Sequence, residues 1–178
     1  MVFTPNSIAQ KECVQKDLSF FRTVGPMDQV QIIGALQSIP LFADLDYQQI
    51  TMLYEAGSLL QIEADEVLCE AETVDENLII FLAGEMRIES SDGQQVAIID
   101  KVRTIGEMGA FTGQARATYV VATQTSTVLV LASDVWGELL ESDPDVGLKI
   151  QSGLLKILYA RMHDMNEELR ALRAEKEK

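Results

Sequence analysis

The sequence predicts a mainly β fold: an antiparallel β jelly roll, or double-stranded β-helix, with N-terminal helices and a long C-terminal helix. Residues 58–132 contain short apolar runs such as NLIIFLAG and TSTVLVLA, and alternating stretches such as MRIES and VAIID. The dipeptide Asp92-Gly93 between the two alternating stretches is typical of a hairpin turn. Seven or eight short strands favour a closed roll over an open sheet, because closure removes exposed strand edges.

The chain divides into three segments. Residues 1–26 form an N-terminal arm, since they show no clear apolar period and end at the structure-breaking pair Gly25-Pro26. Residues 27–142 form the β roll with its flanking helices. Residues 143–178 form the long C-terminal helix, which is expected to serve for coiled-coil dimerisation.

Helices are predicted on both sides of the strands. A first short helix starts near Met27 and ends before Pro40, and a second ends at Gly57. After the strands, SDVWGELLE predicts a short helix, and Asp143-Pro144 provides an N-cap and a proline for the start of the last helix. The apolar face of the first helix consists of Val30, Ile33 and Leu36.

The last helix carries an apolar seam at heptad spacing, interrupted by Gln151. Glu168 falls on a g position and Arg173 on the following e position, a pair that attracts across a parallel two-stranded coiled coil. For the first half of the helix the alternative is packing on its own roll; beyond Met162 little roll remains to be covered, so dimerisation is favoured there. The seam consists of Leu148, Leu155, Leu158, Met162, Met165, Leu169 and Leu172.

Composition excludes several classes of protein. The 178 residues can bury one core, and the net charge of −14, from 28 acids against 14 bases, argues against a direct nucleic-acid partner. No apolar segment reaches the length of a membrane span, and no signal peptide begins the chain, so no membrane association is expected. The two cysteines form neither a disulfide framework nor a thiolate metal site, which fits a reducing cytoplasm.

The stretch GEMGAFTGQAR at residues 106–116 places Glu107 nine residues before Arg116, separated mostly by small or apolar residues. An arginine offers a planar fork of donors to phosphate oxygens. Glu107 would repel a phosphate, so its partner is a hydroxyl, which can donate to a carboxylate. The pair is therefore suited to a ligand that carries both groups.

Four segments in order carry a family resemblance: IPLF at 39–42, LIIFLAGEMRI at 78–88, DGQQVAII at 92–99 and IGEMGAFTGQARATYVVA at 105–122. Over roughly residues 30–172 the chain resembles the cyclic nucleotide-binding domain of catabolite-activator-type regulators, of the regulatory subunits of cyclic-AMP-dependent kinase and of nucleotide-gated channels. In that family the last segment is the phosphate-binding cassette.

The resemblance implies a ligand site. Glu107 would accept a hydrogen bond from the ribose 2′-hydroxyl, and Arg116 would bind the cyclic phosphate together with the backbone amides of Gly109 and Ala117. Small residues let the backbone approach the ligand, and amides at the start of a short helix favour an anion. The full set of site residues implied is Gly106, Glu107, Met108, Gly109, Ala110, Arg116, Ala117, Thr118 and Asn166. Met86 and Met108 are also expected in the core.

The ligand implied is cyclic AMP rather than cyclic GMP, because Ala117 stands where guanine-preferring members tend to carry threonine or serine. The resemblance also implies that the last helix, residues 143–178, acts as a ligand lid. Asn166 on this helix would pair with the adenine ring; alternatively it is an ordinary e-position residue of the coiled coil. The sequence departs from the family pattern at Ala115, where many members have proline, and at Val102 and Tyr119. A loop without that proline is less preordered, which predicts a lower affinity.

The function implied is a non-enzymatic sensor or regulatory module, homodimeric through its C-terminal helix, that transmits ligand binding through that helix to a partner protein or a C-terminal effector domain. An enzyme on a cupin-type jelly roll is disfavoured because His163 is the single histidine and a metal cluster needs more ligands. The remaining alternative is a dimerisation or scaffold module of the same fold that binds no ligand.

Overall fold

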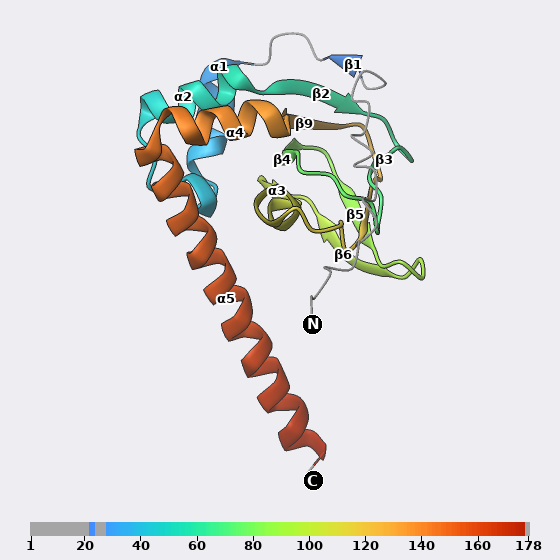
Figure 1. Cartoon of the computed structure of the whole chain (residues 1–178). Coiled ribbons are helices and arrows are strands. Elements are labelled where there is room, and N and C mark those ends of the chain that lie inside the picture. The colour runs from blue at the N-terminus through green and yellow to red at the C-terminus, as the bar shows by residue number, and fades with distance from the viewer. Residues whose placement is uncertain (1–21, 24–27, 177–178) are drawn as a thin grey trace, which may run out of the picture.

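The computed structural model describes residues 22–23 and 28–176, which form two antiparallel sheets flanked by helices (Figure 1). The predicted β roll is confirmed. One sheet has the order β1 (Arg22–Thr23), β2 (Ser58–Ile62), β9 (Ser126–Leu131), β4 (Leu78–Ala83), β7 (Arg103–Ile105). The other has the order β3 (Val67–Cys69), β8 (Tyr119–Ala122), β5 (Met86–Glu89), β6 (Gln95–Ile99). Of the predicted arm at 1–26, only β1 lies within the described residues, and it pairs with β2.

The strands β4 and β9 are apolar on both faces, which explains why their sequences run continuously apolar instead of alternating. Ile79 and Phe81 of β4 point into the space between the two sheets and belong to the hydrophobic core that lies there. Leu78 and Ile80 of the same strand point to the other side and belong to the core shared with the helices. Since side chains alternate across a strand, β4 and β9 form a common wall between two hydrophobic cores.

Apart from α3 (Glu107–Thr112), which follows β7, the helices gather at one end of the molecule, and only the far part of α5 leaves this end (Figure 1). They are α1 (Gln29–Gln37), the 3-10 helix η2 (Pro40–Phe42), α2 (Tyr47–Ala56), α4 (Ser133–Ser142) and α5 (Pro144–Lys176). Asp143 caps α5 as expected, because its carboxylate accepts hydrogen bonds from the backbone N–H groups of Asp145 and Val146. One expectation for α1 is wrong: Ile33 and Leu36 are buried, but Val30 lies exposed in the first turn.

The first turns of α5 contact α2 through hydrogen-bonded polar side chains. The carboxylate of Asp145 accepts hydrogen bonds from Lys149 on the next turn, at 2.6 Å, and from the side chain of Gln49 on α2, at 3.0 Å. The Lys149 ammonium, with the Gln49 amide, holds the pKa of Asp145 below its usual value. These contacts fix the orientation in which α5 leaves the domain.

Helix α5 packs on the domain only through its first half and then extends away from it (Figure 1). The buried face consists of Val146, Gly147, Ile150 and Gly153, which is not the predicted seam. The seam lies outward: Leu148, Leu155, Met162, Met165, Leu169 and Leu172 are 49% to 67% exposed. The alternative that the seam packs on its own roll is therefore wrong for these residues.

Helix α5 approaches η2 closely at Gly153. A Cβ there would lie 2.4 Å from the carbonyl oxygen of Leu41 in η2, so backbone would have to move. We expect Gly153→Ala to lower the free energy of unfolding by about 1–3 kcal/mol, the range for overpacked sites. The measurement is urea denaturation followed by circular dichroism.

Gly137 in α4 provides the matched control, because a Cβ there meets nothing within 4 Å. Gly137→Ala should leave stability unchanged or raise it by up to about 1 kcal/mol, since alanine is the better helix former. Equal stability of the two variants would show that α5 is not held tightly at Gly153.

Candidate functional site

Strand β7 enters α3 through Gly106, which adopts a left-handed conformation with φ of +73°. A Cβ at this position would lie 1.2 Å from Nη1 of Arg116. Both the backbone conformation and the closeness of the guanidinium therefore require glycine. The result is that the start of α3 and the side chain of Arg116 occupy adjacent space.

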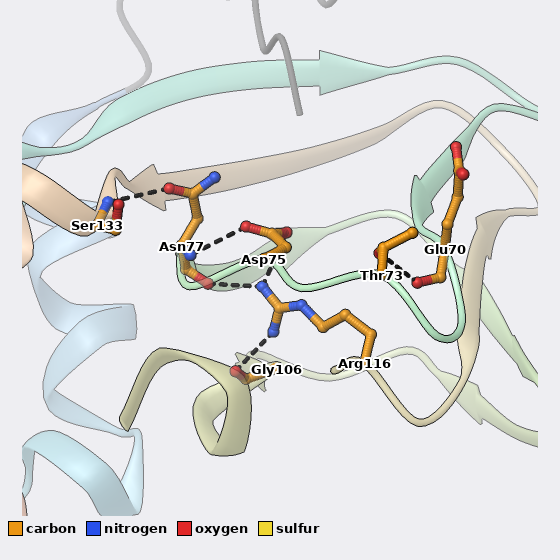
Figure 2. A network of polar contacts seen from close by, with 7 residues as sticks. All are labelled: Glu70, Thr73, Asp75, Asn77, Gly106, Arg116 and Ser133. Atoms are coloured by element: carbon orange, nitrogen blue, oxygen red, sulfur yellow. Dashed lines mark hydrogen bonds and ion pairs between the residues drawn. The ribbon is translucent and has the colours of Figure 1, made fainter. Parts of the chain in front are cut away.

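Arg116 is held inside the protein by three acceptors (Figure 2). Its Nη1 donates to the carbonyl oxygen of Gly106 at 2.6 Å, and its Nη2 donates to Oδ2 of Asp75 at 3.0 Å and to the carbonyl oxygen of Asn77 at 2.7 Å. The side chains of Arg116 and Asp75 are only 4% and 8% exposed. The pair is thus a buried ion pair with additional hydrogen bonds, the arrangement that offsets the cost of desolvating two charges.

The backbone around Arg116 is fixed as well. Its N–H donates to the carbonyl oxygen of Thr73, and its own carbonyl accepts from the N–H of Glu72, both at 2.8 Å. Residues 115–117 therefore run beside the loop between β3 and β4. These backbone hydrogen bonds fix the position from which the Arg116 side chain extends.

One donor of Arg116 has no acceptor. Its Nε is buried and has no hydrogen-bond partner among the described residues. A buried donor left without an acceptor costs about 1–3 kcal/mol, and more when the group is charged. Other atoms of the Arg116 side chain place this residue among those that line a cavity.

The acid that neutralises Arg116 also belongs to a short chain of contacts that reaches α4 (Figure 2). Oδ1 of Asp75 accepts from the backbone N–H of Asn77, and Oδ1 of Asn77 accepts from the backbone N–H of Ser133, each at 3.0 Å. Ser133 is the first residue of α4. The position of Arg116 is thereby connected to the start of the C-terminal helices.

Glu107, the first residue of α3, is buried, and its carboxylate forms an ion pair with Arg161 of α5. The distance between Nη2 of Arg161 and Oε1 of Glu107 is 2.6 Å. The two side chains differ in exposure, at 46% for Arg161 and 5% for Glu107. The long helix thus reaches the site through one charged side chain.

These groups surround a cavity of about 230 Å³ between the end of β7, α3, residues 115–118 and α5. Its polar groups include Glu107, Arg116, Arg161, Arg103, Thr104 and Thr118, and its apolar wall includes Ile88, Ile99 and Val120 from the roll. A cavity with a few charged groups and an apolar wall suits a small polar ligand with a ring system.

The structure brings most of the predicted site residues together. The residues that line the cavity are Gly106, Glu107, Met108, Gly109, Arg116, Ala117 and Thr118. Ala110 does not line it, because it packs against the core shared with the helices. Asn166 is exposed on α5 and is not among the lining residues. Met86 is buried as expected, but Met108 is 38% exposed, so its placement in the core is wrong.

Three residues of the candidate site were missed by the sequence analysis: Asp75, Arg161 and Arg103. Asp75 lies in a loop without a recognisable motif, and 41 residues separate it from Arg116. Arg161 looked like an ordinary polar residue between seam positions of a coiled coil. Only the three-dimensional arrangement places Arg161 and Arg103 at the cavity and Asp75 against Arg116.

Comparison with known proteins supports the resemblance. Residues 59–143 match the family model described as the cyclic nucleotide-binding domain. A cyclic nucleotide-binding domain from Methylobacillus flagellatus aligns with a TM-score of 0.68 and 25% identity, over 78% of this chain and 80% of that chain. The resemblance read from the sequence is thereby confirmed.

More distant structures share the fold. The N-terminal domain of a transcriptional regulator from Streptomyces coelicolor aligns with a TM-score of 0.65 and 21% identity, over 71% of this chain and 94% of that chain. The regulatory domain of Toxoplasma gondii PKA, solved with cAMP, aligns with a TM-score of 0.59 and 21% identity, over 65% and 47% of the two chains.

The curated relatives are longer proteins. An uncharacterized NTE family protein of Mycobacterium tuberculosis is 27% identical over 128 residues, which is 72% of this chain and 21% of that protein. The chain spans about a fifth of the length of the curated relatives it matches. Within residues 22–23 and 28–176, no group of three His, Cys, Asp or Glu side chains could hold a metal ion. No helix in the same ranges is long and apolar enough to cross a bilayer.

The buried pair between Asp75 and Arg116 gives a stability prediction. Asp75→Ala should lower the free energy of unfolding by about 3–5 kcal/mol, because it leaves the guanidinium buried without its counter-ion. Asp44→Ala is the control: Asp44 pairs with Lys156 at 2.6 Å on the surface, and an exposed pair contributes below about 1 kcal/mol. Urea denaturation of both variants measures the difference.

A double variant tests whether the loss of stability comes from the interaction between the two charges. Asp75→Ala with Arg116→Met removes both charges, so it should be less destabilised than the sum of the single changes. Additive losses, or an Asp75→Ala loss no larger than that of Asp44→Ala, would contradict the buried ion pair.

Proposed function

We propose that this chain, which contains a cyclic nucleotide-binding domain over residues 59–143, is a sensor module that binds cyclic AMP in the cavity at α3. The observation that carries the proposal is that one cavity is lined by both Arg116 and the buried acid Glu107. A 3′,5′-cyclic nucleotide has both a singly charged phosphate and a neighbouring hydroxyl to satisfy these two groups.

Arg116 is the phosphate-binding group in this proposal. Its charge is balanced by Asp75, so the ligand's phosphate meets a guanidinium that is already oriented and needs no reorganisation. The backbone amides of Gly109 and Ala117 lie in residues that line the cavity and are proposed as further donors.

Glu107 is the proposed acceptor for the ribose 2′-hydroxyl. Its Oε1 lies 2.6 Å from Nη2 of Arg161, and a carboxylate has a second oxygen that can also accept a hydrogen bond. A hydroxyl can therefore donate to the carboxylate while the ion pair persists. Arg161 also lowers the repulsion between this carboxylate and the nearby phosphate of the ligand.

Two observations favour adenine as the base of the ligand. Ala117 provides no hydroxyl for a guanine, and the PKA domain of the same fold was solved with cAMP. Thr118, which lines the cavity, lies next to Ala117. The role of Asn166 as a base reader stays a prediction, and it requires a movement of α5 because Asn166 is exposed in this structure.

We propose that α5 transmits ligand binding. Two connections support this: the Arg161 to Glu107 ion pair links α5 to α3, and the contact of Asn77 with Ser133 links the Arg116 pocket to α4. A ligand that changes either contact shifts an equilibrium between helix positions, by as much as its affinities for the two positions differ.

We further propose that the exposed seam of α5 joins two copies of the chain in parallel. Six large apolar side chains remain at least 49% exposed along one face of the helix. Glu168 and Arg173 provide the complementary charges that flank such a seam. The receiver of the signal is proposed to be an effector domain or a partner protein, as the greater length of the curated relatives suggests. The cytoplasmic location inferred from the cysteine content stays a prediction.

The ligand is tested by isothermal titration calorimetry with cyclic AMP, cyclic GMP and 2′-deoxy cyclic AMP. The wild-type chain should bind cyclic AMP about 5- to 100-fold more tightly than the deoxy analogue. With the analogue, the buried carboxylate of Glu107 has no hydroxyl to accept from, and a buried acceptor without its donor costs affinity on this scale. Glu107→Ala should bring the two affinities close together, since no acceptor then remains to be satisfied.

Glu138→Ala, an exposed acid on α4 away from the cavity, should keep the wild-type preference. No heat with any cyclic nucleotide would favour the scaffold module that binds no ligand. Equal affinity of the wild type for cyclic AMP and 2′-deoxy cyclic AMP would show that Glu107 does not bind the ribose hydroxyl.

The dimer is tested by sedimentation equilibrium of the double variant Met162→Lys with Leu169→Lys. The wild type should sediment as a dimer and this variant as a monomer, because four buried charges would face one another in the seam. Ala171→Lys with Ala174→Lys adds the same charge at positions outside the seam and should stay dimeric. A seam variant that remains a dimer would place the interface elsewhere.

A further inference from the structure

A second cavity lies beside the first, between β7 and the packed part of α5, with a volume of about 440 Å³. We call it the basic cavity, because four of the fourteen Lys and Arg residues of a chain with net charge −14 line it. The four are Lys101, Arg103, Lys156 and Arg161, with Asp164 as the one acid among the lining residues. The apolar part of the wall is Ile39, Pro40, Ile157 and Ala160.

The cations of the basic cavity are not all neutralised. Lys156 pairs with Asp44, and Arg161 pairs with Glu107, both at 2.6 Å. The side chains of Lys101 and Arg103 form no ion pair with any residue in the described ranges. The wall of this cavity thus carries two cations without an ion-pair partner among the described residues, and one acid, Asp164.

Acids are twice as numerous as bases in this chain. Cations that line one cavity are therefore an unusual local concentration of positive charge. A concave wall lined by one sign of charge raises the local concentration of counter-ions. Arginine offers a fork of donors and lysine a point charge, a combination that suits a phosphate group. The apolar wall formed by η2 and α5 suits the organic part of such a ligand.

We propose that the basic cavity binds a small organic phosphate monoester, separate from the cyclic nucleotide, with its phosphate on Lys101 and Arg103 and its apolar part against Ile39 and Ile157. This site goes beyond the proposed function, because neither Lys101 nor the apolar wall takes part in the cavity at α3.

The two cavities share three residues, Arg103, Thr104 and Arg161. A phosphate in the basic cavity attracts Arg161 away from Glu107, which leaves that carboxylate uncompensated next to the phosphate of the cyclic nucleotide. Each ligand therefore weakens the binding of the other, and by linkage the two effects are equal in size.

The test uses the full chain and phenyl phosphate as the probe, titrated by calorimetry at constant ionic strength. We expect one site per chain and tighter binding than that of inorganic phosphate, because of the apolar wall. Lys101→Gln with Arg103→Gln should weaken the probe at least about tenfold, the scale of a lost charge-assisted contact. Thermal unfolding shows whether this variant is folded.

Arg170→Gln with Lys176→Gln is the matched control, since it removes two cations of α5 that line neither cavity. It should bind the probe as the wild type does. Equal weakening in both variants would mean non-specific attraction, and no heat with the wild type would overturn the site. Because the probe is titrated without cyclic nucleotide, failure of either proposal can be recognised independently of the other.

Adding the probe at saturation should raise the dissociation constant of cyclic AMP in the wild type, and Arg161→Gln should abolish this effect. An unchanged dissociation constant in the wild type would contradict the sharing of Arg161 between the two sites.

Discussion

The buried ion pair between Arg116 and Asp75 is the interaction on which the rest of the site depends. A guanidinium that is almost completely removed from water needs its counter-ion and most of its hydrogen bonds satisfied, and the surrounding chain is arranged to do this. Gly106 must lack a side chain to make room for it, and the loop between β3 and β4 must bring both Asp75 and Asn77. One donor, Nε, has no acceptor among the described residues, so the hydrogen bonding of this guanidinium is incomplete there.

The scaffold separates a rigid part from a part that can change position. Strand β4 belongs to both hydrophobic cores, so the roll and the helices that cover it form one packed unit. The far half of α5 has no comparable packing, and its one ion pair with α3 is made by the half-exposed Arg161. Interactions with so little buried area open at low cost, which is where a response to ligand is expected.

How much could be predicted from the sequence depended on how local each feature is. The strands, the turn at Asp92-Gly93 and the acid and base of the segment 106–116 lie within short stretches, so their patterns predict them directly. Asp75 and Arg161 reach the site from distant segments, and nothing in their neighbours marks them. The errors at Val30 and Met108 occurred at helix ends, where apolar spacing continues although no neighbouring element covers the residue.

The contact between Gly153 and Leu41 gives α5 the mechanical properties of a lever. The helix continues from Gly153 to Lys176, which is 23 residues or about 35 Å at the rise of an α-helix. A rotation of about 10° around this fulcrum moves the far end by roughly 6 Å, more than the pitch of one helical turn. Arg161, only two turns beyond the fulcrum, moves by about 2 Å in the same rotation. A displacement of Arg161 comparable to the distance over which its ion pair breaks is thus amplified about threefold at the end of the helix.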